Sequence, residues 1–281
     1  MLAALDGDEA RTGADVSLED GSLDSLGNGL PKASGETTGA SVAVDFDLKA
    51  GESKTVRFVL TWYYPILHGI NSHAYLHAYG PRFKDAVAVA EMMAVHHQGL
   101  LDRVIAWQEV IYAEDSLPGW LRDCLVNTLY LLAEDAFWET NSIPGEPWVQ
   151  ESGMFTMVES TRTCPGQSCI PSDFYGNFPV VYFFPELAMS TLRGFANLQR
   201  PNGEIPIYWG QNYDRQNPVY QLLHVTSPCN YVDIVDRLWL RTGDDAIVHE
   251  LFPSVKQPLN PMAPRISMAA RRPKAHSFLK I

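Results

Sequence analysis

The sequence is poor in positive charge. Its 281 residues hold 21 lysines and arginines against 33 aspartates and glutamates, which gives a formal net charge of −12. This balance argues against non-specific binding to nucleic acid or to anionic membranes, because both carry negative charge. The basic residues are also unevenly placed. The segment from Lys256 to Ile281 holds six of them and no acidic residue.

Cysteines and long apolar runs are scarce as well. Four cysteines in a chain of 281 residues do not form a disulfide scaffold. Cys164 and Cys169 flank a Pro-Gly-Gln-Ser turn, and they are either two free thiols or one bridge that clamps this loop. No apolar run approaches the roughly 20 residues of a membrane span. We therefore expect no transmembrane segment. The first residues do not resemble a signal peptide, which favours the cytoplasm.

Several familiar catalytic motifs are missing. The sequence has no Gly-rich phosphate loop and no Ser/His/Asp signature. His73 and His77 have the i, i+4 spacing of metal ligands on a helix, but the His-Glu-x-x-His context is absent and Gly80-Pro81 follows at once. The sequence therefore predicts neither a metal site nor a cofactor.

The first 67 residues favour β-structure after a long irregular start. Residues 1–40 are rich in Gly, Ser, Asp and Thr, which is typical of loops or disorder. Alternating apolar and polar side chains predict strands over 41–47 and 56–62. Two strands cannot bury a sheet face alone, so we expect residues 1–67 to hold the last strands of a β-sandwich. The face expected to be buried carries Val56, Phe58, Leu60 and Trp62.

From residue 68 onward the pattern becomes helical. Residues 82–112 predict one long helix, with a break near Gly99, in a linker region that spans 68–116. Ser116 is an N-cap candidate for the next helix. Further helices are predicted over 120–138, 178–198 with a kink at Pro185, 219–223 and 231–241.

These helices define the expected fold. Strong helices joined by long loops over 117–257 suggest a mainly α fold, an (α/α)6 toroid in which paired helices ring a central cleft. The helices found in the sequence are too few for a full ring, so we expect an incomplete toroid. Residues 258–281 contain four prolines and a basic run, and they predict an irregular tail.

A single carboxylate marks the best candidate for catalysis. Glu159 follows the apolar run from Met154 to Val158 and precedes a loop rich in Thr, Cys, Gly and Pro. An acid held on a firm element beside an open cleft suits a glycosidase nucleophile. The alternative is an ordinary surface carboxylate at a strand end. Asp173 either approaches Glu159 and tunes its ionisation or caps the following helix.

Aromatic side chains near this carboxylate can stack on a sugar or fill the core. They are Trp148, Phe155, Tyr175, Tyr208, Trp209 and Tyr213.

Separated segments also resemble a known family in their order. The segments are Val59-Leu-Thr-Trp, Tyr79-Gly-Pro-Arg, Leu117-Pro-Gly-Trp, Phe174-Tyr-Gly-Asn-Phe with Phe184-Pro-Glu-Leu, and Asn230-Tyr-Val-Asp through Arg241-Thr-Gly-Asp. They resemble, in turn, the last strand of the N-terminal β-sandwich, the linker helix, the beginning of the (α/α)6 domain, the segment after the nucleophile and a later barrel helix of glycoside hydrolase family 116. This is the family of the non-lysosomal glucosylceramidase, or bile-acid β-glucosidase.

The resemblance implies a retaining β-glycosidase that hydrolyses β-linked glycosides. Glu159 falls at the position of the nucleophile, and we take Asp173, Tyr175, Tyr208 and Trp209 as substrate-binding candidates. The family's general acid/base lies far beyond its nucleophile, so we expect a partial chain that lacks this residue. Where the family has a histidine that contacts the sugar, this chain has Ile207. The alternative is a non-catalytic carbohydrate-binding or structural relic of the same fold.

Overall fold

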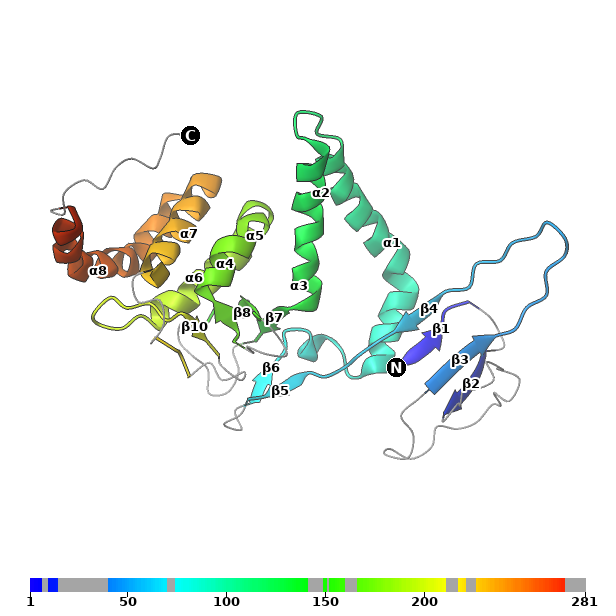
Figure 1. Ribbon diagram of the computed structural model, residues 1–281. Helices are drawn as coiled ribbons and strands as arrows, with labels where there is room; N and C mark the ends of the chain where they lie inside the picture. The colour runs from blue at the N-terminus through cyan, green and yellow to red at the C-terminus, as the bar shows by residue number, and fades with distance from the viewer. Residues whose placement is uncertain are drawn as a thin grey trace. The chain divides into compact units, whose positions relative to one another are not determined.

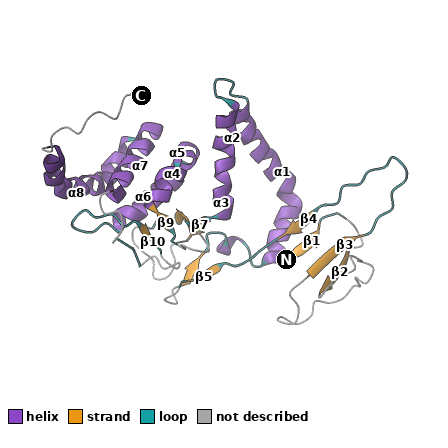
Figure 2. Cartoon of the chain, viewed as in Figure 1, coloured by secondary structure: helices purple, strands orange, loops and turns teal. Residues whose placement is uncertain are grey.

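The computed structural model describes the chain in two compact units. The first comprises Met1–Tyr64 with Tyr79–Glu109, and the second Pro65–Ala78 with Val110–Ile281. Figures 1 and 2 show the elements of both, and each unit is described by itself. The described residues are 1–6, 10–14, 40–69, 74–140, 149–150, 152–159, 166–210, 217–220 and 226–270, with side chains left out at 14, 40 and 258–270.

The first unit contains two short antiparallel ladders. β1 (Leu2–Ala4) pairs with β4 (Phe58–Leu60), and β2 (Ala10–Ala14) pairs with β3 (Ala40–Val44). The two strands expected from the sequence are therefore present, but each pairs with a strand from the region expected to be irregular. That expectation was wrong for β1 and β2, whose alanines and glycine have low strand propensity and gain their order from the pairing. The β-sandwich itself stays a prediction.

β4 buries the face opposite to the predicted one. Val59 and Thr61 are 8% and 3% exposed, whereas Trp62 is 74% exposed. The predicted face was the one that carries Val56, Phe58, Leu60 and Trp62. Thr61 can be buried because its hydroxyl donates a hydrogen bond of 3.0 Å to the carbonyl of Ala86, which satisfies the polar group.

One long helix follows the strands. The 3-10 helix η1 (Gly80–Arg82) leads into α1 (Ala86–Tyr112). Asp85 caps α1, because its Oδ1 accepts a 2.8 Å hydrogen bond from the backbone N–H of Ala88. The predicted break near Gly99 does not occur. A Cβ at Gly99 would meet nothing within 4 Å, so the glycine lies on an open side of an unbroken helix.

The second unit begins with small antiparallel sheets. His77 forms a bridge with Glu139, which places the first hairpin beside the second. The pairs are β5 (Ile66–His68) with β6 (Ala74–Leu76), β7 (Ala136–Glu139) with β8 (Met154–Met157), and β9 (Ser168–Cys169) with β10 (Tyr208–Trp209).

The helix predicted over 120–138 was wrong in its second half. The chain forms α2 (Gly119–Asn127), the 3-10 helix η2 (Thr128–Tyr130) and the single turn α3 (Leu131–Glu134), and then enters β7. The aromatic residues of β7 fit either a helix or a strand, and the ladder with β8 decides for the strand. Ser116 is not the N-cap, because Pro118 occupies that position without a side-chain hydrogen bond.

Five further helices lie in the described part of the second unit. The kink expected at Pro185 is a full break at Phe184, since proline has no N–H to continue a helix but suits its first turn. The prediction of a helix over 219–223 was wrong at Val219, because Val219 forms a β-bridge with Tyr208. The helices are α4 (Ile170–Gly176), α5 (Phe178–Phe183), α6 (Pro185–Asn197), α7 (Thr226–Thr242) and α8 (Asp245–Ala270).

The tail predicted to be irregular from residue 258 is helical as far as Ala270, which corrects that expectation. Methionine, leucine and alanine stand between its prolines, and these are strong helix formers.

The core of the second unit lies where α6 and α7 meet β8 and β10. The inward residues of both helices recur at helical spacing, as an amphipathic pattern requires. Burying a large apolar side chain contributes about 1.5–3 kcal/mol. The fully or almost fully buried members are Met154, Ile170, Leu192, Phe195, Ile205, Trp209, Tyr231, Ile234, Leu238 and Leu251. The fold is thus mainly helical with small antiparallel sheets, and the toroid remains a prediction.

Two glycine-to-alanine substitutions, one in the second unit and one in α1, test these descriptions of the fold. Gly210 has φ +66°, and an added Cβ would lie 2.4 Å from Oε1 of Gln167, so Gly210→Ala should destabilise the second unit by about 2 kcal/mol. Gly99→Ala should instead stabilise α1 by about 0.5–1 kcal/mol, because it meets open space in a helix. Thermal or urea unfolding measures both. A loss of stability in Gly99→Ala, or none in Gly210→Ala, would contradict these assignments.

The exposed apolar side chains of α1 predict self-association. Val95 and Val110 are 75% and 74% exposed, and Leu101 and Val104 are about half exposed. Apolar patches of this kind promote association in water. We expect size-exclusion elution of the 281-residue chain to shift earlier as its concentration rises. Replacing Val95 and Val110 by glutamine should reduce the shift, and a clean monomer at every concentration would refute the expectation.

Candidate active site

The backbone around Glu159 is held while its side chain stays exposed. Glu159 lies two residues beyond the end of β8, and its N–H donates a 3.1 Å hydrogen bond to the carbonyl of Gly166. The preceding Val158 donates to the carbonyl of Asp135 at 2.8 Å. A fixed backbone and an open carboxylate are what a nucleophile requires, because the attacking oxygen must be both positioned and accessible.

Asp173 lies inside α4, and it is not a helix cap. Cys169 occupies the N-cap position, and Asp173 belongs to the first turn of the helix. Its side chain is only 5% exposed. Oδ2 has no hydrogen-bond partner within the described part of the chain. The alternative that Asp173 merely caps the helix was therefore wrong.

Burial and charge keep Asp173 protonated over a wide pH range. Its pKa is raised from 3.8 to about 8, first by burial and then by the negative charge of Glu159. The same carboxylate acts on Cys169, whose pKa is raised to about 12 by burial, by its hydrogen bond with Glu159 and by the charge of Glu159. The two carboxyl groups and the thiol therefore form one electrostatic cluster.

Tyr208 belongs to the same cluster through strand pairing. It lies opposite Cys169 in the β9–β10 ladder. Its ring packs over Gly166, where a Cβ would lie 3.2 Å from a ring carbon of the tyrosine. Because Gly166 also accepts the hydrogen bond from Glu159, the half-buried Tyr208 is placed at the candidate nucleophile. Of the residues predicted for the site, the structure thus brings together Glu159, Asp173 and Tyr208.

The other predicted substrate contacts lie elsewhere. Trp209 is fully buried, and its ring packs edge-on against Phe195 with a centroid distance of 6.2 Å. A core ring of this kind cannot stack on a sugar. Tyr175 is 76% exposed and contacts Phe174, one residue before it, so it is not part of the cluster. Ile207 is also a core residue. Trp148 and Tyr213 lie outside the described residues.

The remaining sequence candidates concern thiols, metals and membranes. Cys169 is a buried free cysteine, while Cys164 and His73 lie outside the described residues. The ring of His77 packs against Phe137, and burial lowers its pKa. Within the described ranges, no three His, Cys, Asp or Glu residues are grouped as metal ligands. None of the described helices is long and apolar enough to cross a membrane.

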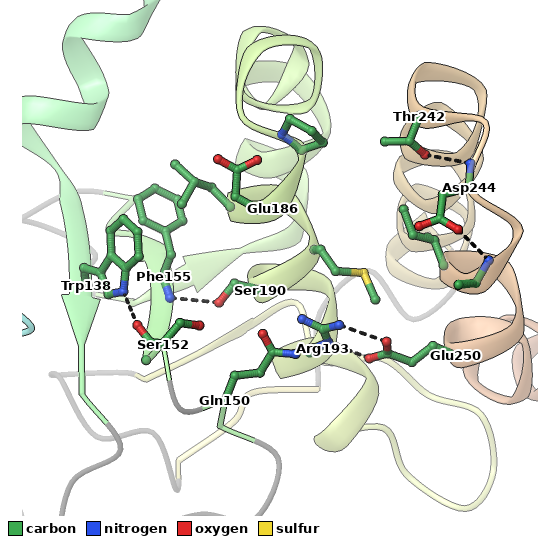
Figure 3. Close-up of a pocket in the computed structure, with 16 residues that line it drawn as sticks. Trp138, Gln150, Ser152, Phe155, Glu186, Ser190, Arg193, Thr242, Asp244 and Glu250 are labelled. Carbon is green, nitrogen blue, oxygen red and sulfur yellow. Dashed lines mark hydrogen bonds and ion pairs between the residues drawn. The ribbon is translucent and has the colours of Figure 1, made fainter.

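The sequence did not reveal a separate cavity in the second unit (Figure 3). Its volume is about 640 Å³, and it lies between the β7–β8 hairpin, α6 and the turn from α7 to α8. Its most visible sequence signal is the i, i+4, i+7 spacing of Glu186, Ser190 and Arg193, which places all three on one face of α6. Arg193 binds Glu250 through two nitrogen–oxygen contacts of 2.5 and 2.9 Å, which holds the pKa of Glu250 below its usual range.

A comparison with known families matched part of the chain. Residues 8–100 match the model described as beta-glucosidase 2, glycosyl-hydrolase family 116 N-terminal domain. The match confirms the resemblance to family 116, which is a family of glycoside hydrolases. It covers most of the first unit, whereas Glu159, Asp173 and Tyr208 lie outside the matched range. The roles of these three residues are therefore proposals.

The raised pKa of Asp173 predicts a specific pH dependence of stability. An unfolded aspartate releases its proton near pH 3.8, whereas folded Asp173 keeps it to about pH 8. Between these values the folded state binds the extra proton, so stability falls as the pH rises from about 4 to about 8. Asp173→Asn removes this slope. Its stability relative to the unchanged protein should therefore rise with pH.

Unfolding by urea between pH 4 and pH 9 measures this effect. Asp236→Asn, at an exposed carboxylate on α7, is the matched control and should leave the pH profile unchanged. Parallel profiles for Asp173→Asn and the unchanged protein would show that Asp173 does not hold its proton in the folded state.

Proposed function

We propose that this chain carries the nucleophile of a retaining β-glycosidase, with Glu159 in that role. The observation that supports it best is the contrast between two neighbouring carboxyl groups. Glu159 is exposed at the end of β8, whereas Asp173 is buried with a pKa of about 8. An open carboxylate beside a closed carboxylic acid is the arrangement by which one site holds both an ionised and a neutral group at neutral pH.

The chemistry assigned to Glu159 is a displacement at the anomeric carbon. A carboxylate oxygen of Glu159 forms a bond to this carbon while the bond to the leaving oxygen breaks. The leaving oxygen must then take a proton from a general acid unless it is a stable anion by itself. Water later attacks the glycosyl ester and releases the sugar with its original configuration.

Asp173 and Tyr208 are assigned supporting roles at the same site. Neutral Asp173 limits the negative charge beside Glu159, because two adjacent carboxylates do not both ionise readily. Because its side chain is only 5% exposed, Asp173 is assigned this effect on Glu159 and no contact with the sugar. Tyr208 offers a half-buried ring next to the nucleophile, and such a ring can stack on a sugar face. The burial of Trp209 and the outward position of Tyr175 do not support the same role for them.

We further infer that the helices of the second unit belong to an (α/α)6 toroid and the ladders of the first unit to a β-sandwich. The packing of α5 on α6 and of α7 on α8 supports the toroid, since consecutive helices pair in that fold. The match to the N-terminal domain of family 116 supports the sandwich. The substrate proposed is a β-linked glycoside.

Covalent labelling tests the role of Glu159. A 2-deoxy-2-fluoro-β-glucoside with a dinitrophenyl leaving group needs little acid assistance, so we expect slow formation of one glycosyl ester even without a general acid. Peptide mass mapping should place the label on Glu159. Glu159→Gln should take no label, while Glu134→Gln, at an exposed glutamate of α3, should be labelled as the unchanged chain is. Label on any other carboxylate would refute the assignment. Complete absence of label would favour the non-catalytic alternative.

A further inference from the structure

The cavity in Figure 3 is distinct from the proposed catalytic site, because none of Glu159, Asp173 and Tyr208 lines it. We propose that it binds an organic cation, an amine or quaternary ammonium group attached to an apolar body. The proposal concerns a second ligand site and does not depend on the reaction proposed for Glu159. It rests on the charge of the lining, on the hydrogen bonds its polar groups already make and on the exposed indole in its wall.

The charge of the lining is negative. Three carboxylates border the cavity, those of Glu186, Asp244 and Glu250. Arg193 is the one cation among the described lining residues, and Glu250 engages it at 2.5 and 2.9 Å. A bidentate pair leaves little attraction for a further anion. The two remaining carboxylates therefore favour a positively charged ligand.

Glu186 is the acid best placed to meet such a ligand. Figure 3 shows its carboxylate at the upper edge of the cavity, near Phe155 and opposite Thr242. The side chain is exposed, and it makes no hydrogen bond or ion pair within the described part of the chain. Glu186 also stands in the first turn of α6, where the helix dipole favours a negative charge. Asp244 uses Oδ1 to accept a 2.9 Å hydrogen bond from the N–H of Ala246, which leaves its second oxygen for a ligand.

Two hydroxyls and the indole N–H of the lining are already engaged. Ser190 Oγ accepts a 2.8 Å hydrogen bond from the N–H of Phe155, and Thr242 Oγ1 donates one of 2.9 Å to the carbonyl of Leu238. The indole N–H of Trp138 donates to the carbonyl of Ser152 at 2.9 Å. Gln150 and Ser152 are the other neutral polar residues of the lining, so the charge of the carboxylates rather than neutral hydrogen bonding distinguishes the ligand. An ammonium group needs only acceptors, which the carboxylates provide.

The walls suit an apolar body attached to the cation. Trp138 is 44% exposed, and the hydrogen bond of its N–H fixes the orientation of its ring. Phe155 packs edge-on against it with a centroid distance of 6.1 Å. An ammonium group over an exposed indole face gains cation–π attraction. The apolar lining also includes Pro185, Leu187, Met189 and Ile247.

Benzylamine and benzyl alcohol provide a direct test, because they share shape and size and differ in charge at pH 7. Titration of the full 281-residue chain, followed by ligand-observed NMR, should show at least about fivefold tighter binding of benzylamine. Benzoate should bind more weakly than either. The advantage of the amine should shrink as salt rises from 20 to 500 mM, since salt screens exposed charges. This salt series uses the unchanged protein, so it tests the contribution of charge to benzylamine binding without any substitution.

Two substitutions locate the site. Glu186→Gln should weaken benzylamine binding about fivefold and leave benzyl alcohol unchanged. Trp138→Leu should weaken both ligands. Asp236→Asn makes the same change of charge at an exposed carboxylate of α7 that does not line the cavity, and it should alter neither. Equal affinity for the amine and the alcohol, an insensitivity to salt, or an unchanged affinity for benzylamine in Glu186→Gln would overturn the proposal.

Discussion

The burial of Trp209 against α6 is the contact on which the second unit depends. A Cβ at Gly194 would lie 2.5 Å from Cζ2 of this indole, so only glycine lets the ring approach the helix so closely. Phe195 packs against the same ring from the next position on α6. This contact fixes β10, and β10 in turn pairs with β9. The hydrogen bond of 2.7 Å from the N–H of Ile170 to the carbonyl of Ile207 then sets where α4 begins.

These contacts of Trp209, β10, β9 and α4 also determine the geometry of the candidate active site. Asp173 is buried because α4 starts at Ile170 and turns its first-turn carboxyl inward. The carboxylate of Glu159 stays exposed because the residue lies beyond the end of β8. Its backbone N–H alone is bound by the carbonyl of Gly166, near β9. Two carboxyl groups that look alike in the sequence therefore receive opposite environments. Since burial penalises the charged form, the environment rather than the residue type makes one a carboxylate and the other an acid.

Arg237 shows how the neighbouring helices are held in place around α4. Its guanidinium lies 3.9 Å from the ring centre of Phe178 and donates a 2.9 Å hydrogen bond to the carbonyl of Phe174. One side chain of α7 thus binds both α4 and α5. Its pairing with Asp233 on the same helix keeps the charge compensated while the aromatic rings cover it.

The sequence by itself determined the helical periodicity of α1, α6 and α7, a disturbance of the helix at Pro185 and the identity of Glu159 as the carboxylate after an apolar strand. These are local properties, set by side-chain spacing and by the missing N–H of proline. Only the tertiary structure decided which face of β4 is buried, that residues 136–139 form a strand, and that Trp209 belongs to the core. Each of these depends on a partner distant in sequence: the carbonyl of Ala86 for Thr61, β8 for β7, and Gly194 for Trp209. Local pattern does not encode such partners, because strand pairing and core packing gain their free energy from contacts that exist only after the chain has folded.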